Sequence, residues 1–186
     1  MQSRLRDADF DTALERMELQ TGYRYWCGLD RRYGVPSLHD LDPLDIVKIL
    51  PLVNLVDVAT QPDGNYRFRH RLVGTGLVDR FRGEHTGQWF DDLYTSDHLA
   101  RQLPYYRAAI EDRTPTVGDV SLDVEGTWTL SYRRLILPMT EGDGAVTCLM
   151  LIFAFFNGPD RLVLTNDGLP LHQPGRGSRR GTGAAP

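Results

Sequence analysis

The longest apolar run of the chain, AVTCLMLIFAFF at residues 145–156, most constrains its fold. Successive side chains of a β-strand point to opposite faces, and here the side chains of both faces are apolar. The run therefore predicts a central strand, in a sheet that is covered on both faces. It is far too short to cross a membrane, which takes about 20 apolar residues in a helix.

Four further strands are predicted from alternation, β-branched residues and the turns between them. The segment YRFRHRLV shows the pattern best, because arginines alternate with aromatic, histidine and leucine residues. Tight turns make neighbouring strands antiparallel, and the first hairpin can join the last strand only if the middle segment crosses over the sheet. The predicted strands are residues 52–60, 66–73, 114–124, 128–139 and 145–156.

Helices are predicted before the sheet and in its long middle connection. Apolar residues recur at helical spacing in residues 8–30, and again at steps of four and three residues in residues 96–112. The fold class is therefore α+β: a five-stranded antiparallel sheet with helices on one face and an N-terminal helix. That first helix is left to cover the other face or to pair with another subunit.

These elements divide the chain into three parts. Residues 1–34 hold the N-terminal helix, which we expect to be a dimer or partner surface, and residues 35–156 form the domain. Residues 157–186 are rich in glycine, proline and arginine, which is typical of a flexible tail. The N-terminal segment is charged throughout and has no apolar signal-peptide core. We expect a cytoplasmic protein without membrane insertion.

Composition argues against several classes of function. The net charge of −4 gives the molecule no broad attraction to nucleic acid. Cys27 and Cys148 lie in apolar settings, which favours two reduced and buried thiols over a disulfide or a metal site. The histidines show no metal-ligand spacing, and no serine lies in Gly-x-Ser-x-Gly. We therefore expect no metal, no nucleic-acid partner and no enzymatic activity.

The sequence Gly74-Thr75-Gly76 follows a predicted strand and precedes a predicted helical turn, as in a phosphate-binding loop. A dinucleotide site needs a third glycine inside a parallel strand-helix-strand unit. Here Asp79 takes that position, and its carboxylate would repel a pyrophosphate. The preceding strand also belongs to a hairpin. We therefore interpret the two glycines as conformational, because they let the backbone leave the sheet and turn.

Several short motifs, taken in order, resemble a PAS domain, and more narrowly a family of small single-domain PAS proteins common in alphaproteobacteria. The resemblance covers residues 20–156 and implies a PAS-like fold with a ligand cavity between the sheet and the helix at residues 96–112. One departure is His70, where the family pattern has an aromatic residue such as tyrosine. The motifs are Tyr25-Trp26, Pro36-Ser37, Asp42-Pro43-Leu44-Asp45-Ile46, Leu50-Pro51, Arg71-Leu72-Val73-Gly74-Thr75, Thr86-Gly87 and Leu137-Pro138.

The candidate ligand-binding residues come from four elements that should surround this cavity. The alternation of the strand at residues 128–139 leaves open whether Tyr132 and Arg134 or Arg133 points inward, and a buried arginine would need an anion. Tyr25 and Trp26 are the candidate partner surface. The candidate ligand residues are Phe68, His70, Leu72, Tyr106, Tyr132, Arg134, Cys148 and Met150.

His70 and the arginine stripe each have two interpretations. His70 is either a hydrogen-bonded core residue or a pocket-lining group, for instance a haem ligand, although we favour neither haem nor flavin as a cofactor. A flavin adduct at Cys148 lacks the sequence motif that it needs. The stripe formed by Arg67, Arg69 and Arg71 is either a solvated face, paired with residues such as Asp57, or a surface for an anionic ligand or partner.

Three hypotheses about function follow. The first is a sensory or regulatory module that binds a small ligand and signals, as a homodimer, through contacts with an unknown protein. The second is a ligand-free adaptor with a filled core, and the third, disfavoured by the missing catalytic groups, is an enzyme. Cavity volume separates the first two, since ligand sites measure on the order of several hundred cubic ångströms.

Overall fold

Five strands form one antiparallel sheet in the order β2-β1-β5-β4-β3. The computed structural model describes residue 10 and residues 14–124, 128–142 and 144–156, so the predicted tail lies outside the described residues. The strands are β1 (Val53–Thr60), β2 (Tyr66–Val73), β3 (Thr116–Val124), β4 (Trp128–Met139) and β5 (Cys148–Phe155).

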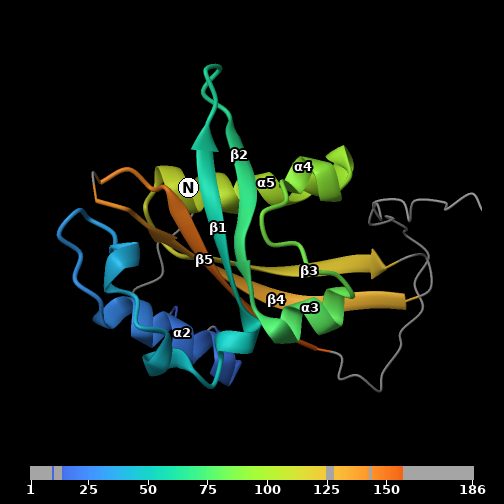
Figure 1. Cartoon of the computed structure of the whole chain (residues 1–186), viewed down its shortest axis with the longest axis horizontal. Coiled ribbons are helices and arrows are strands. Elements are labelled where there is room, and N and C mark those ends of the chain that lie inside the picture. The colour runs from blue at the N-terminus through green and yellow to red at the C-terminus, as the bar shows by residue number, and fades with distance from the viewer. Residues whose placement is uncertain (1–9, 11–13, 125–127, 143, 157–186) are drawn as a thin grey trace, which may run out of the picture.

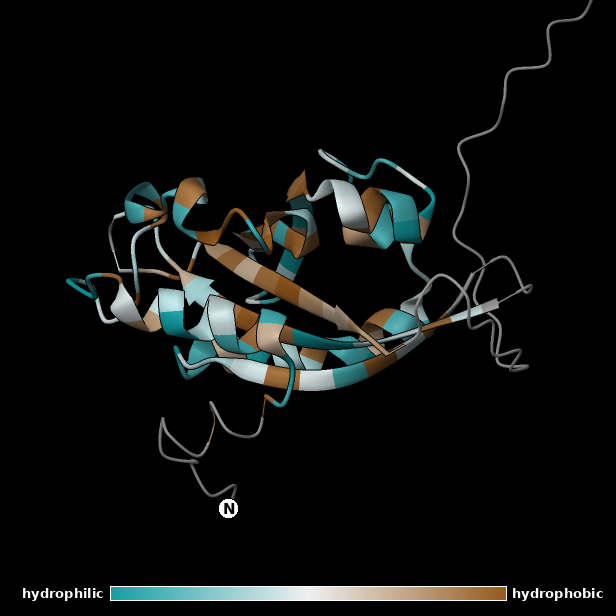
Figure 2. Ribbon diagram, turned by 90° about the horizontal axis from the view of Figure 1, so that it is seen from below, coloured by the Kyte–Doolittle hydropathy of each residue, from teal (hydrophilic) through white to brown (hydrophobic). Residues whose placement is uncertain are grey.

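The predicted topology is confirmed, because β1 pairs with β5 and so joins the first hairpin to the last strand. Every residue of β5 is buried, as expected for a central strand covered on both faces. The segment between β2 and β3 crosses over one face of the sheet (Figure 1). Helices lie on both sides of the sheet, and the strands between them carry many hydrophobic residues (Figure 2).

Two layers cover the sheet. The α5 layer consists of α3 (Thr75–Phe81), α4 (Phe90–Leu93) and α5 (Ser96–Glu111), which pack with one set of strand residues into an aromatic-rich core. The α2 layer packs with the alternate set and covers the opposite face, so the first helix is part of this chain's own core. It consists of α2 (Met17–Gly28), η1 (Leu38–Asp40), η2 (Pro43–Ile46) and η3 (Leu50–Leu52).

The helix α2 begins at Met17, later than predicted, and continues without interruption through Thr21 and Gly22. A Cβ added to Gly22 would lie 1.8 Å from Cδ1 of Ile152 on β5, so glycine is the residue that permits this close approach. The indole Nε1 of Trp26 donates a hydrogen bond of 2.9 Å to the carbonyl of Pro138 on β4. These contacts fix α2 against the centre of the sheet.

A bulge changes the phase of β2 near its end. Leu55 pairs with Leu72, whereas the next residue of β1, Val56, pairs with His70, so Arg71 is an extra residue. An extra residue moves every later side chain of the strand to the opposite face. As a result, Val73 faces the α5 layer, and Leu72 does not.

Gly74 marks a close approach of two backbone segments. A Cβ at Gly74 would lie 2.5 Å from the carbonyl oxygen of Pro51 and 2.7 Å from that of Leu50. Its φ of −61° is open to any residue. The glycine is therefore needed for space beside η3, and not for the unusual conformation that the sequence suggested.

Candidate functional site

A cavity lies between the sheet and the α5 layer, where the family resemblance places it. Its volume is about 30 Å³, which has room for about two water molecules. Aromatic and aliphatic side chains form most of its wall. The polar and aromatic polar residues that line it are Asn54, His70, His85, Tyr94, His98, Gln102, Tyr106, Tyr132 and Arg134.

His70 is held as a neutral ring in the wall of this cavity. Its Nδ1 lies 2.9 Å from Nδ2 of Asn54 and 3.3 Å from Oδ1, so the shorter contact makes Nδ1 an acceptor. The hydrogen then resides on Nε2, which lies 3.5 Å from the Tyr94 hydroxyl. Burial lowers the pKa of His70 to about 3, and His85 adds to the shift.

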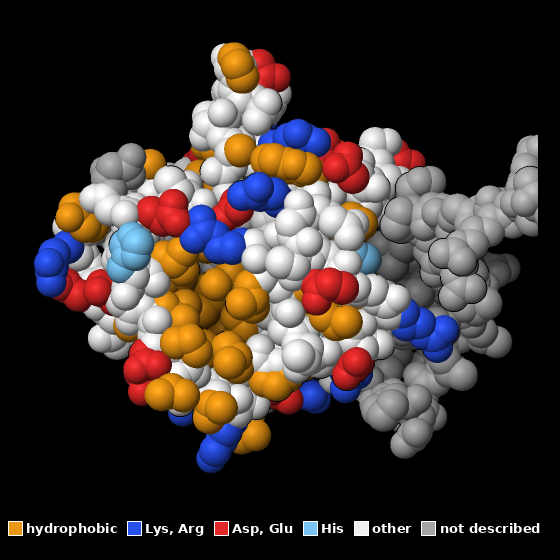
Figure 3. Space-filling model, viewed as in Figure 1, with side chains coloured by type: hydrophobic (Ala, Val, Ile, Leu, Met, Phe, Trp, Pro, Cys, Tyr) orange, Lys and Arg blue, Asp and Glu red, His pale blue; other side chains and the backbone are white. Residues whose placement is uncertain are grey.

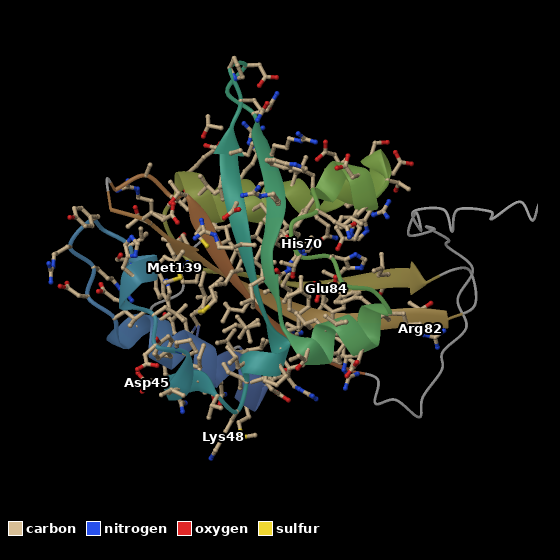
Figure 4. The ribbon with its side chains drawn as sticks, viewed as in Figure 1. Asp45, Lys48, His70, Arg82, Glu84 and Met139 are labelled. Atoms are coloured by element: carbon tan, nitrogen blue, oxygen red, sulfur yellow. The ribbon has the colours of Figure 1, made fainter. Side chains whose placement is uncertain are left out.

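His85 also lines the cavity, and it lies in the segment that follows α3. Both of its ring nitrogens are buried without a hydrogen-bond partner among the described residues, and its ring centre lies 6.1 Å from that of His70. Burial lowers the pKa of His85, while Glu84 acts in the opposite direction. Figure 4 shows the segment that carries Glu84 beside His70.

Arg134 points into the cavity and is only 5% exposed, which settles the orientation of β4. Its Nη2 donates a hydrogen bond of 2.9 Å to Oε1 of Gln102, and its guanidinium lies 4.6 Å from the ring centre of Tyr106. Its Nε is buried without a hydrogen-bond partner in the described part of the chain. Both identified contacts of this cation are therefore neutral groups.

The helix α5 contributes a polar edge to the cavity, of which only Tyr106 was predicted from the sequence. His98, Gln102 and Tyr106 follow one another at steps of four residues, so they share a face of the helix and all reach the cavity. That spacing was present in the sequence as a signal. Burial lowers the pKa of His98 to about 4, with further contributions from Arg101 and Arg134.

Five of the eight predicted ligand residues line the cavity, and three do not. Leu72 follows the bulge at Arg71, so its side chain points away from the cavity, and it is 43% exposed. Cys148 and Met150 face the α2 layer, because the alternate residues of β5, which include Leu151 and Phe153, face the cavity. The five that line it are Phe68, His70, Tyr106, Tyr132 and Arg134.

The predicted partner surface and one cysteine also need correction. Trp26 is 2% exposed and packs on the sheet, so it is not available to a partner. Tyr25 is half-buried, and its hydroxyl accepts a hydrogen bond of 2.7 Å from the backbone nitrogen of Asp42. Cys27 is exposed and not buried, whereas Cys148 is buried as predicted.

The arginine stripe on β2 is a salt-bridged surface. Arg67 binds the carboxylate of Asp91 through two contacts of 2.9 and 3.0 Å, and its guanidinium lies 4.1 Å from the Trp89 ring centre. Arg69 and Arg71 share Asp57, as one interpretation of the sequence expected. The stripe therefore has carboxylate partners of its own.

Neither haem nor flavin fits the cavity as the structure has it. A space for about two water molecules admits no porphyrin or isoalloxazine ring. Both cysteines fall in the described part of the chain and neither lines the cavity, so no thiol is placed to form an adduct with a ligand there. Among the residues described, no three metal-ligating side chains gather. No helix in the described ranges is long and apolar enough to cross a membrane.

A family model described as a PAS domain matches residues 14–152. Among solved structures, a fungal light-oxygen-voltage (LOV) domain photoreceptor is similar at 14% identity and a TM-score of 0.43, over 73% of this chain and 90% of that chain. The blue-light photoreceptor Aureochrome1 LOV is similar at 11% identity and a TM-score of 0.42, over 59% and 84%. No curated protein matches the chain. The structural likenesses are too distant to transfer a ligand or an activity.

Proposed function

Because the chain belongs to the PAS domain family, we propose that it is a sensory or regulatory module that binds a small ligand in its cavity and signals through protein contacts. The observation that supports ligand binding most strongly is the set of buried polar groups without partners. Buried nitrogen atoms without hydrogen bonds cost about 1–3 kcal/mol each, and a core that served packing alone would not need them.

The alternative, a ligand-free adaptor with a filled core, is supported by the small volume of the cavity. The unpartnered nitrogens of His85 and Arg134 favour the sensory module over it. Aliphatic side chains at these positions would close the core without that cost. The cavity as described suits a compound of a few non-hydrogen atoms, or the polar end of a larger one.

The strand β5 supplies a physical route from the cavity to the α2 layer. Leu151 and Phe153 line the cavity, and Ile152 between them packs against Gly22 of α2. If a bound ligand displaces β5 by a fraction of an ångström, Ile152 moves with the strand and changes its contact with α2 on the opposite face of the sheet. We expect the ligand to favour one of two positions of α2, which requires different affinities for the two states.

Homodimer formation is proposed at the exposed surface around η2 and the start of α2. Met17, Leu44 and Val47 are 76%, 77% and 57% exposed, and a patch of exposed apolar side chains is a candidate contact surface. Asp45 and Lys48 lie on the same exposed segment (Figure 4). In a two-fold dimer the same patch of both copies would meet, so the apolar side chains and the opposite charges of this segment would lie in one interface.

A native mass spectrum of the purified protein, compared with its denatured mass, tests ligand binding. We expect extra mass that is lost on denaturation. The variant Val73→Phe, which fills the cavity, should lose this mass, whereas Leu72→Phe at the adjacent exposed position should keep it. A bare-chain mass for the native protein would instead support the adaptor with a filled core.

A further inference from the structure

The cavity contains one permanent cation and no carboxylate to balance it. Arg134 remains charged at every relevant pH, because a guanidinium does not lose its proton in proteins. No aspartate or glutamate lines the cavity, and the hydrogen-bond partner of Arg134 among the described residues is the amide oxygen of Gln102. Burying an unpaired charge costs several kcal/mol.

The contrast with the next residue makes this cation unusual. Arg133 points to the opposite face, where its Nε and Nη2 bind both oxygens of Asp119 at 2.7 and 3.0 Å. Arg134, which is more deeply buried, has only the amide oxygen of Gln102 and the face of Tyr106. The chain thus supplies a carboxylate to the arginine that needs it less.

The remaining polar groups of the cavity suit an anion of single charge. His70 and His85 stay neutral because burial lowers the pKa of both rings, so each offers one N–H and adds no further charge. Phosphate carries more charge than one guanidinium balances. A carboxylate matches the planar fork of Arg134 and forms charge-assisted hydrogen bonds with it.

We propose that the cavity binds a small monocarboxylate, whose oxygens accept hydrogen bonds from Arg134 while its short apolar end lies against the aromatic wall. This inference rests on the proposed sensory function and names its ligand class. Gln102 holds the guanidinium in place from α5. The volume of about 30 Å³ suits a compound the size of formate or acetate, and a longer acid would need side chains to move.

The side-chain Nε–H signals of the arginines in an isotope-labelled sample give a local readout of binding. We expect sodium acetate, with sodium chloride as the ionic-strength control, to shift the Arg134 signal in a saturable way. Acetamide, which has nearly the same shape and no charge, should not shift it. The Arg134 signal is identified by its loss in Arg134→Met, and a cavity-lining reporter such as the Gln102 amide follows binding in the variants.

Arg134→Met should weaken acetate binding about tenfold or more, since hydrogen bonds to charged groups contribute about 1.5–3 kcal/mol each. Arg134→Lys keeps the charge without the planar fork and should retain weaker binding. The matched control Arg133→Met should bind as the native protein does. A correct fold in each variant is checked from the remaining backbone signals.

An equal response to acetamide, or unchanged acetate binding in Arg134→Met, would overturn the inference. The native mass spectrum then separates the two proposals. A retained neutral compound would leave the sensory function standing without the carboxylate. A bare chain together with no response to acetate would reject both.

Discussion

The two faces of the sheet are built from alternate residues of the same strands, yet they bury different kinds of side chain. Towards the α2 layer the buried cluster consists of apolar side chains, aromatic ones included, among them Met150 and Ile152. Towards the α5 layer the same strands bury Asn54, His70 and Arg134. Both faces therefore have a hydrophobic core, and the α5 face in addition buries polar groups that packing does not require.

The surface of the molecule shows the same division. On the face seen in Figure 3, hydrophobic side chains gather in a hollow beside the α2 layer. The arginines of β2, in contrast, have carboxylate partners such as Asp57 and Asp91. The arginines of this stripe are paired with carboxylates, whereas Arg134 inside the cavity has the neutral amide of Gln102 as its hydrogen-bond partner. The comparison predicts that substitutions on the two faces will have opposite effects on stability and on binding.

The largest loss of stability is expected on the α2 face. Ile152→Ala removes a fully buried side chain that packs against Gly22, and the cavity it leaves should lower the free energy of unfolding by about 2–5 kcal/mol. Urea denaturation followed by circular dichroism measures the loss. The control Leu72→Ala, at an exposed position, should change the free energy by about 0.5 kcal/mol or less. Equal losses in both variants would contradict this account of the α2 face.

Arg134→Met should have the opposite effect on the cavity face. Replacing an unpaired buried cation by an apolar side chain of similar length removes a desolvation cost, so stability should stay the same or rise by up to about 4 kcal/mol. The same denaturation experiment measures it in the absence of added carboxylate. A loss of about 3–5 kcal/mol would instead mean that Arg134 has a charged partner within the folded chain.

The histidines of the cavity should make stability depend on pH. His70 has a pKa near 6.5 when unfolded and about 3 when folded, so below pH 6.5 the unfolded chain binds the proton that the folded chain excludes. As the pH falls from about 6 to about 4, this difference lowers the free energy of unfolding by about 1.4 kcal/mol per pH unit. When the free energy of unfolding from denaturation curves is plotted against pH over this range, His70→Gln should show a shallower slope than the native protein. The exposed His39→Gln is the control and should leave the slope unchanged.

The smallest effect is expected from the ion pairs at the surface. Arg67→Ala breaks an exposed contact with Asp91, and pairs of this kind contribute about 0.2–1 kcal/mol. The loss should shrink as salt concentration rises, because exposed charges are screened. A loss above 2 kcal/mol at high salt would show that the Trp89 contact, rather than the ion pair, holds Arg67 in place.

Most of the fold could be predicted from the sequence, because alternation, turns and the apolar run of β5 are local signals. The phase of a strand is less secure. Because of the single bulge at Arg71, Val73 lines the cavity and Leu72 does not. No residue type in this segment indicates a bulge. On β5 both faces are apolar, so nothing in the sequence distinguished Cys148 and Met150 from the alternate set that lines the cavity.

The polar part of the site was harder to predict for a different reason. His85 lies in a loop, where no periodicity indicates which way a side chain points. The sequence indicates that one of the two arginines of β4 points inward and would need an anion. Only the register of the sheet shows that this residue is Arg134. Alternation gives two faces, and tertiary packing decides which of them meets the cavity.

The most direct test of the difference between the two faces is a high-resolution crystal structure of the protein grown with sodium acetate. We expect planar electron density within hydrogen-bond distance of the Arg134 guanidinium, and no space for any ligand between α2 and β5. A cavity closed by side chains, or one that holds only water beside Arg134, would contradict it and favour an adaptor with a filled core.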